Sequence, residues 1–366
     1  MKTVKFIGDD PAQKLFAHAV RKNVNAYFKE KGLSTKGGAA MVVKSFLILG
    51  MYLAPFILLL TIHLPLWGAF LLVIMMGIGE AGVGMGVMHD AVHGAFSEKK
   101  WVNELFGFSM FLLGSNTFNW KIQHNLLHHT FTNIEGMDED IETKAVIRLC
   151  EHTPLKKYHR FQYLYAYVLY GLMTLSKFVT DIAQLVDFNR SGITKEQHKK
   201  PGTEMFKLIV TKIVYLLLVL GLPLWLTDYA WWQILIGFCL MHITTGMILS
   251  TVFQMAHVVE GTEQPLPDKD GVVHNEWAVH ELLTTSDFGR HNRLLNWYVG
   301  GLNFQIEHHL FPHTCHMHYH NLAPIVQRTA MEFGIHYNLK PSLKAAFISH
   351  AKRLWALGRP VQMKHN

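Results

Sequence analysis

The chain has little cysteine, with three residues among 366: Cys150, Cys239 and Cys315. The number is odd and the spacings are wide, which argues against a disulfide framework, and there is no Cys-x-x-Cys pair of the kind that binds zinc. Sparse, unpaired cysteine is typical of a protein whose cysteines lie in a reducing compartment.

Charged residues are also scarce, at 17% of the chain, whereas 50% of the residues are hydrophobic. This composition is too apolar for a soluble protein of this length. The apolar residues gather in two blocks, 41–88 and 206–254, and each block is long enough to cross a bilayer twice. We therefore predict an all-α integral membrane protein in which two hairpins carry a helical cytoplasmic cap. The predicted spans are residues 41–62, 66–88, 206–227 and 231–254.

Lysine and arginine are absent from the short turns inside these blocks, "TIHLPLW" and "LTDYAWW", but nine of them lie between Lys2 and Lys44. Excess Lys and Arg mark the cytoplasmic side, so we predict a multi-pass protein with both termini and the long polar segments in the cytoplasm. The basic start argues against a cleaved signal peptide. The net charge of +7 does not indicate nucleic-acid binding, because no basic stripe is interleaved with aromatic residues.

Outside the spans, an amphipathic helix is predicted to begin after Asp10, a candidate N-cap followed by proline, and to end near Gly32. Its apolar face either lies on the membrane surface or packs against the cytoplasmic cap. The residues of that face are Leu15, Phe16, Val20, Val24, Tyr27 and Phe28.

The chain divides in this scheme into a cytoplasmic segment (residues 1–40), a membrane domain (41–335) and a cytoplasmic tail (336–366). Two shorter apolar stretches, 105–118 and 161–179, are interpreted as cytoplasmic-side or interfacial helices. For the second stretch, a membrane span stays open as an alternative.

Histidine is abundant, with 24 residues, and its clustering is more informative than its number. The motifs "HDAVH" and "HNLLHH" each place two histidines four residues apart, so that both rings project from one helical face. Together with "QIEHH", they all lie just beyond an apolar segment. The clustered residues are His89, His93, His124, His128, His129, His308 and His309, and His257 follows the fourth predicted span.

Imidazole ligands suit zinc, copper, iron or nickel by softness alone. A single zinc ion needs only three or four ligands. Eight candidate imidazoles therefore favour a pair of redox metals, with iron as the expected metal. Gln305 stands one helical turn before His309, where a further imidazole would be expected.

The three motifs together resemble the histidine boxes of the membrane fatty acid desaturases, which are non-haem di-iron oxidases. The resemblance covers most of the chain, up to Pro324, and is strongest to the front-end group, in which glutamine opens the third box as in "GGLNFQIEHHLFP". It implies two iron ions held by the seven clustered histidines and His257. For Gln305 it leaves two roles, as a weak iron ligand or as a hydrogen-bond partner of a bound water.

Carboxylates near the boxes are candidates to orient the imidazoles, because metal-bound histidine usually donates its other N–H to a carboxylate or carbonyl. Asp90, Asp138, Asp140 and Glu307 are close enough in sequence, whereas Glu139 and Glu142 are expected in a solvated loop. His242 lies within the fourth predicted span, where we expect a neutral ring bonded to a neighbouring helix. The histidines after the third box, His313, His316, His318 and His320, are not assigned to the metal site.

The resemblance implies an O2-dependent oxidoreductase that places a cis double bond between the carboxyl end of an acyl chain and an existing double bond. Acyl-CoA, acyl-lipid and sphingoid-base substrates stay open. The sequence contains no HPGG motif of a fused cytochrome b5 domain. Electrons are therefore expected from a separate ferredoxin or cytochrome b5 type carrier with its reductase.

Three other functions are weighed against a desaturase. A hydroxylase or acetylenase on the same di-iron scaffold would differ only in geometry near the iron. A haem-binding membrane cytochrome would need axial histidines inside facing spans, and a metal transporter would need histidines along a path through the bilayer. Only His242 lies deep within a predicted span.

Overall fold

The computed structural model describes residues 4–143 and 146–360, and the chain forms two compact units. Unit 1 contains residues 1–37, 123–166 and 252–366, and unit 2 contains residues 38–122 and 167–251. Both units are helical, as predicted. In the described part of the chain, strands are limited to two parallel pairs of two residues each, β1 (Lys5–Phe6) with β2 (Val272–Val273) and β3 (Asp287–Phe288) with β4 (Leu339–Lys340).

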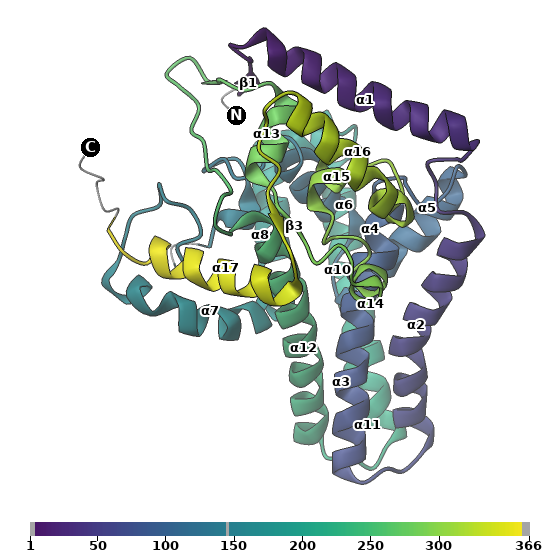
Figure 1. The fold of residues 1–366 in the computed structure, drawn as a ribbon. Helices are drawn as coiled ribbons and strands as arrows, with labels where there is room; N and C mark the ends of the chain where they lie inside the picture. The colour runs from purple at the N-terminus through teal and green to yellow at the C-terminus, as the bar shows by residue number, and fades with distance from the viewer. Residues whose placement is uncertain (1–3, 144–145, 361–366) are drawn as a thin grey trace. The chain divides into compact units, whose positions relative to one another are not determined.

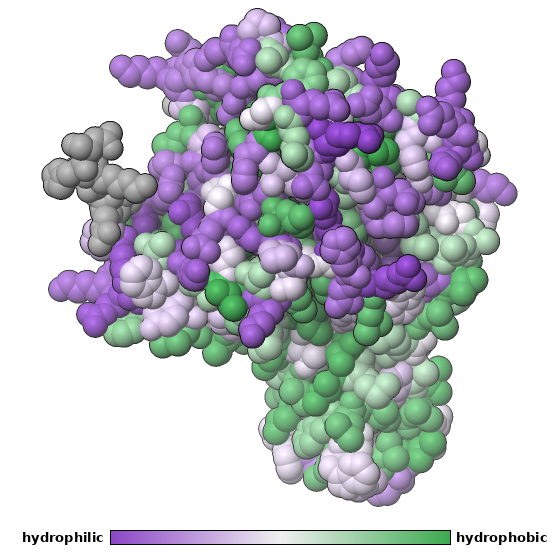
Figure 2. All heavy atoms as spheres, viewed as in Figure 1, coloured by the Kyte–Doolittle hydropathy of each residue, from purple (hydrophilic) through white to green (hydrophobic). Residues whose placement is uncertain are grey.

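Four helices are long and apolar enough to cross a membrane, and they confirm the predicted spans with slightly different ends. These candidate spans are Gly38–Thr61, Leu66–Val92, Pro201–Leu226 and Trp231–His257. In unit 2, α2 (Gly38–Thr61) and α3 (Leu66–Val83) run side by side as one hairpin (Figure 1). In Figure 2, mostly apolar side chains cover the length of the candidate spans, and residues of lower hydropathy lie at their turn ends.

Two of the candidate spans contain a π-helical turn. In the second span, η1 (Gly84–Met88) joins α3 to α4 (His89–Val92), so the helix continues past the predicted end at Met88. In the third span, η6 (Leu217–Gly221) joins α10 (Pro201–Leu216) to α11 (Leu222–Leu226). The spacing of the apolar residues could not reveal these π-helical turns. Each adds only one residue to a helical turn, and most positions in these spans are apolar.

The shorter apolar stretches form shorter helices, and neither gives a candidate span within the described residues. The helices in and directly after these two stretches are α5 (Lys100–Gly107), η2 (Phe108–Leu113), α6 (Thr117–Trp120), α7 (Gln162–Gly171), α8 (Met173–Arg190) and α9 (Ile193–Glu196).

Glycine allows the first two spans to approach closely. A Cβ atom added at Gly79 of α3 would lie 2.6 Å from the Met51 carbonyl carbon and the Tyr52 nitrogen of α2. Small residues permit such backbone contact between membrane helices, where dispersion replaces the hydrophobic effect as the main attraction. The α2–α3 hairpin thus depends on the missing side chain at Gly79.

We expect Gly79→Val to destabilise the protein by at least about 1–3 kcal/mol, the usual cost of overpacking, because backbone atoms of α2 cannot move aside as a side chain can. The measurement is the thermal unfolding midpoint of the detergent-solubilised protein. Gly50→Val on α2 is the matched control, since a Cβ atom there would meet nothing within 4 Å. Equal midpoints for the two variants would contradict the close approach.

His242 is buried within α12 (Trp231–His257) and contacts three other helices of unit 2, as predicted for a histidine at this depth. Its Nε2 lies 3.0 Å from the Tyr215 hydroxyl, and its Nδ1 lies 3.2 Å from Thr174 Oγ1 and 3.6 Å from Glu80 Oε1. Thr245 donates a hydrogen bond to the other oxygen of Glu80. These contacts give the polar groups partners inside an otherwise apolar bundle.

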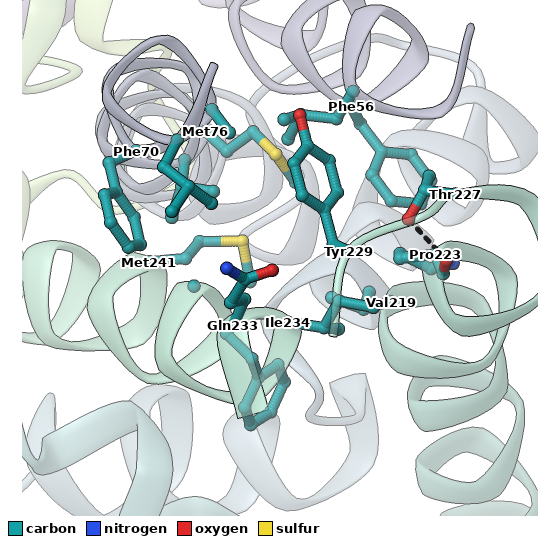
Figure 3. A pocket seen from close by; sticks show the side chains of 16 residues that line it. Phe56, Phe70, Met76, Val219, Pro223, Thr227, Tyr229, Gln233, Ile234 and Met241 are labelled. Carbon is teal, nitrogen blue, oxygen red and sulfur yellow. Dashed lines mark hydrogen bonds between the residues drawn. The ribbon is translucent and has the colours of Figure 1, made fainter. Parts of the chain in front are cut away.

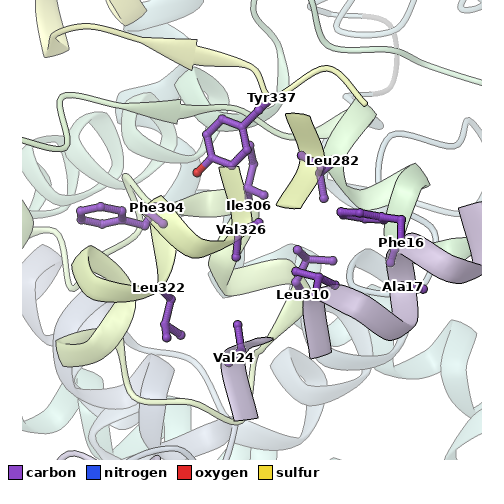
Figure 4. Close-up of a cluster of buried hydrophobic side chains, with 14 of the residues drawn as sticks. Phe16, Ala17, Val24, Leu282, Phe304, Ile306, Leu310, Leu322, Val326 and Tyr337 are labelled. Atoms are coloured by element: carbon purple, nitrogen blue, oxygen red, sulfur yellow. The ribbon is translucent and has the colours of Figure 1, made fainter. Parts of the chain in front are cut away.

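The core of unit 1 forms around α1 (Pro11–Lys31) and α16 (Tyr319–Glu332). Asp10 caps α1 by accepting a hydrogen bond from the Ala12 N–H, and Gly32 ends it at a φ of 61°, as predicted. The buried face of α1 packs on α16 and on α13 (Trp277–Thr284), which favours the second of the two predicted settings for this helix (Figure 4). Leu15 does not share that face and is 61% exposed.

The remaining elements of unit 1 are short, apart from α17, and they carry or support the polar segments between the core helices. They are η3 (Lys121–His128), η4 (Glu139–Ile141), η5 (Lys157–Phe161), α14 (Arg293–Tyr298), α15 (Gln305–Leu310), η7 (His316–His318) and α17 (Leu343–Leu357). The first of these begins at the border with unit 2.

Candidate metal centre

The second histidine box lies on a π-helix, η3, and not on the α-helix that its spacing predicts. The His129 N–H donates a hydrogen bond to the His124 carbonyl, five residues back. This wider turn brings the Nε2 atoms of His124 and His129 to within 3.2 Å of each other. The His129 ring therefore lies beside the His124 ring, whereas α-helical spacing would place it further round the helix. The rings of His124 and His128 stack with centroids 5.2 Å apart.

Six of the predicted ligands come together in the interior of unit 1. One nitrogen from each of His128, His257 and His309 lies within 4.8 Å of the others, and the same holds for His129, His308 and His309. His309 therefore belongs to both groups. All six are buried: His124, His128, His129, His257, His308 and His309. Chain segments 124–129, 257 and 308–309 thus converge on one cluster of imidazoles.

Asp138 orients His128, as predicted. Its Oδ1 lies 3.0 Å from His128 Nδ1, and Asp140 Oδ2 lies 3.3 Å from the same nitrogen. A carboxylate only accepts, so Nδ1 keeps its proton, and Nε2 is the nitrogen that would bind a metal once it has lost its own proton. Burial opposes the charged form of His128, but Asp138 and Asp140 raise its pKa to about 9. Burial likewise opposes the charge of Asp138, yet the His128 ring lowers the pKa of that carboxyl.

Glu281 plays the same part for His309, and the sequence analysis did not identify it. Its Oε2 lies 2.7 Å from His309 Nδ1 and accepts a hydrogen bond from Thr132 at 2.9 Å. Burial raises the pKa of Glu281 well above its usual range, and the positive charge of a metal bound to His309 would lower it again. The only sequence signal was a carboxylate inside the apolar segment "WAVHELLT", where an uncompensated charge is costly and therefore notable.

Asn133 was also missed, and it ties the second box to His257. Its side-chain nitrogen lies 3.0 Å from the His257 carbonyl, 3.2 Å from the Glu263 carbonyl and 3.0 Å from the Thr284 carbonyl. Its backbone N–H donates to Asp138, and its φ of 60° is in the left-handed region that asparagine tolerates. Asn133 therefore fixes the segment that follows His129.

Gln305 lies against the imidazole cluster. Its Nε2 is 2.9 Å from His257 Nε2 and 3.3 Å from His309 Nε2. Within the described residues, its Oε1 is buried and has no hydrogen-bond partner. An amide oxygen without a hydrogen-bond partner in this position can either ligate a metal or accept a hydrogen bond from a metal-bound water. Both predicted roles of Gln305 therefore stay open.

The first box lies in unit 2. His89 belongs to α4 and His93 caps its C-terminus; both are buried, with ring centroids 4.8 Å apart. The Trp120 ring packs edge-on against both. Asp90 was a candidate to orient an imidazole, and its Oδ1 lies 3.9 Å from His89 Nδ1, which is longer than a hydrogen bond.

Glu307, predicted to orient a histidine, instead forms a buried group with Asp287 and Tyr337. The Tyr337 hydroxyl oxygen lies 2.6 Å from Asp287 Oδ2 and 2.8 Å from Glu307 Oε1. Burial and the neighbouring Asp287 raise the pKa of Glu307 well above its usual range. One hydroxyl donates only one proton, so the second contact requires a protonated carboxyl.

We expect Tyr337→Phe to lower the free energy of unfolding by about 1–3 kcal/mol, the penalty for leaving buried polar groups without their partner. The measurement is the unfolding midpoint in detergent. Tyr165→Phe is the control, because it removes an exposed hydrogen bond to the Val146 carbonyl. A loss no larger than that of the control would contradict the buried arrangement.

The other histidines near the third box have different surroundings. His318 Nε2 lies 3.3 Å from the Lys36 carbonyl, and the His313 carbonyl accepts a hydrogen bond from Lys36 Nζ. His316 is buried and His320 is exposed. His280, which the sequence analysis did not single out, lies 3.0 Å from the Thr132 carbonyl through Nε2 and supports the segment after the second box.

The donor set of unit 1 fits a transition metal. Buried imidazoles and an amide oxygen suit borderline ions such as iron, and the carboxylates behind His128 and His309 supply compensating negative charge. Among the described residues, His128 Nε2 is buried without a hydrogen-bond partner. A metal ion there would satisfy that nitrogen and replace the positive charge of its second proton.

Comparison with known proteins agrees with this chemistry. The model of the fatty acid desaturase family matches residues 39–341. The chain is 34% identical over 350 residues to an sn-1 linoleoyl-lipid 6-desaturase of Synechocystis sp., covering 94% of this chain and 96% of that protein. It is 33% identical over 346 residues to an acyl-lipid (8-3)-desaturase of Physcomitrium patens, covering 94% of this chain and 72% of that protein. With a match over most of its length, the chain belongs to the fatty acid desaturase family.

Proposed function

We propose that this protein is a front-end acyl-lipid desaturase, an oxidoreductase of the membrane that introduces a cis double bond into an already unsaturated acyl chain. The observation that carries the proposal is the buried cluster of six histidines in unit 1, with carboxylates on the outer nitrogens of His128 and His309. The named relatives support the substrate class, since they act on linoleoyl-lipid or acyl-lipid. Residues 41–335 form the enzymatic domain in this proposal.

The proposed ligands of two iron ions are the six histidines of this cluster with His89 and His93, and Gln305 is a ligand or a water-binding residue. The assignment of His89 and His93 is supported by the first histidine box in the sequence. When bound, the iron pair supplies the oxidising power for removal of hydrogen from an unactivated methylene with O2, which no side chain can supply. Family membership and the imidazole donors favour iron over zinc.

Two carboxylates determine which nitrogen of the neighbouring histidines carries the proton. Asp138 and Glu281 would keep the Nδ1 protons of His128 and His309 in place, which would leave the two Nε2 atoms to bind the metal. Asn133 donates a hydrogen bond to the carbonyl of His257, and Thr132 donates one to Glu281. Because every member is buried, bulk water is kept from the reacting centre.

The proposal places both termini and the metal centre on the cytoplasmic side, where a separate ferredoxin or cytochrome b5 type carrier and its reductase deliver electrons. The absence of Lys and Arg from the turns at residues 62–65 and 227–230 supports this orientation. The apolar candidate spans support an enzyme embedded in the same bilayer as its proposed lipid substrate.

The test is expression of the full chain in a host fed defined polyunsaturated acids, with an electron donor supplied and double bonds located by mass spectrometry. We expect a new double bond on the carboxyl side of an existing one, in membrane lipid. Purified protein should contain iron and show no Soret band. A hydroxylated product would favour the alternative chemistry on the same scaffold, and no modified chain despite a working donor would refute the proposal.

A further inference from the structure

Unit 2 contains an apolar cavity between its candidate spans (Figure 3). The empty space between these helices measures about 630 Å³, including the part that is open to the surroundings. All four candidate spans contribute to its wall, including Phe56, Phe70, Val219 and Phe238. No charged residue lines it, so its occupant must be apolar over most of its length.

The polar lining residues gather at one end of the cavity. Thr227, Tyr229 and Gln233 lie at the turn between α11 and α12, and their side chains bond to backbone groups of the turns. Exposed tryptophans, Trp67, Trp225, Trp231 and Trp232, surround the same end of the spans. Tryptophan marks the boundary between hydrocarbon and headgroups, so this end of the cavity lies at headgroup depth.

The cavity extends inward by about the thickness of one leaflet. On α3 its lining runs from Leu66 to Met76, and the ten residue steps between them span about 15 Å at the rise of an α-helix. Half of the hydrocarbon core of a bilayer is also about 15 Å. A lipid whose glycerol lies at the mouth can therefore place one acyl chain along the full depth.

The inner end is closed by helix packing. A Cβ atom added at Gly77 of α3 would lie 2.6 Å from the Met241 carbonyl of α12, so the two helices are in contact just beyond Met76. Met76 also precedes His89 by thirteen residues, about 20 Å of helix. The closed inner end and this distance separate the cavity from His89, so an acyl chain that reacts beside His89 would not fill this cavity; this step rests on the proposed function.

We propose that the cavity binds one acyl chain of a bilayer phospholipid from the leaflet at the hairpin turns, as a resident lipid and not as the substrate. An empty apolar cavity of this size would leave its lining without dispersion contacts on one side. The surrounding hydrocarbon is the nearest material that restores them. The lipid joins the two hairpins of unit 2 by contacting α3 and α12 together.

The test is photolabelling of the full-length protein in phosphatidylcholine vesicles that contain phosphatidylcholine with a diazirine at the end of its sn-2 chain. Peptides are mapped by mass spectrometry, and no turnover is needed, so the result does not depend on desaturase activity. We expect labels concentrated on the peptides that contain residues 66–76 and 233–241. Labels spread evenly over the outer faces of the spans would overturn the proposal.

Gly237→Phe places a ring in the cavity, because its Cβ would make an ordinary 3.5 Å contact with Val73. We expect it to reduce labelling of both peptides to the level of the outer faces, while Gly50→Phe, which meets nothing within 4 Å, leaves labelling unchanged. Ala69→Phe is a second filling variant should Gly237→Phe not fold. Stronger labelling by a diazirine linoleic acid or sterol than by the phospholipid would also overturn the proposal.

Discussion

His309→Ala is expected to abolish desaturation and to lower the bound iron. His309 is the one histidine shared by the two groups of three nitrogens in unit 1, so its loss depletes both. Removing a residue that merely orients a ligand usually costs 10- to 100-fold in metal affinity or activity, so losing the ligand itself should cost more than about 100-fold. Iron per chain and the product formed in cells are the two measurements.

His320→Ala is the matched control for this variant. It removes an imidazole from the same segment of chain, but His320 is exposed at the start of α16. We expect wild-type iron content and product from the control. Activity of His309→Ala near that of His320→Ala would contradict the assignment of His309 as a ligand.

The helices were predictable where their determinants are local. Asp10, Pro11 and Gly32 specify both ends of α1 within a few residues of sequence, and the structure has them as caps. The spans were predictable because a bilayer requires a long apolar run whatever the tertiary contacts. Leu15 follows the same apolar spacing yet is exposed, because the packing of α1 on α16 decides which stripe is buried.

The histidines that cluster in unit 1 could be picked out from the sequence as candidates, but their surroundings could not. Asp138 lies ten residues from His128 and was a natural candidate, whereas Glu281 lies 28 residues from His309 and reaches it only through the packing of α13 on α15. The π-helix beneath "HNLLHH" changes which rings meet without changing the motif. Glu307 is adjacent in sequence to the candidate ligand His308, but its side chain lies with Tyr337.

Glu281→Gln is expected to lower iron content and activity by about 10- to 100-fold, with little change in volume. Glutamate accepts the proton of His309 Nδ1 at 2.7 Å, which leaves the Nε2 lone pair for the metal. The amide of glutamine can instead donate to Nδ1, and this favours the tautomer whose Nε2 carries hydrogen. That tautomer cannot ligate through Nε2.

The control and the readouts separate this effect from a loss of folding. Glu263→Gln makes the same change at an exposed side chain near the site and should behave as wild type. Because Thr132 also bonds Glu281, Thr132→Val should weaken iron binding less than Glu281→Gln does, since the carboxylate and its contact with His309 remain. An unfolding midpoint close to wild type with reduced iron is expected for Glu281→Gln. Full iron content in that variant would contradict the role of Glu281. It would mean that Glu281 serves only packing and does not determine the tautomer of His309.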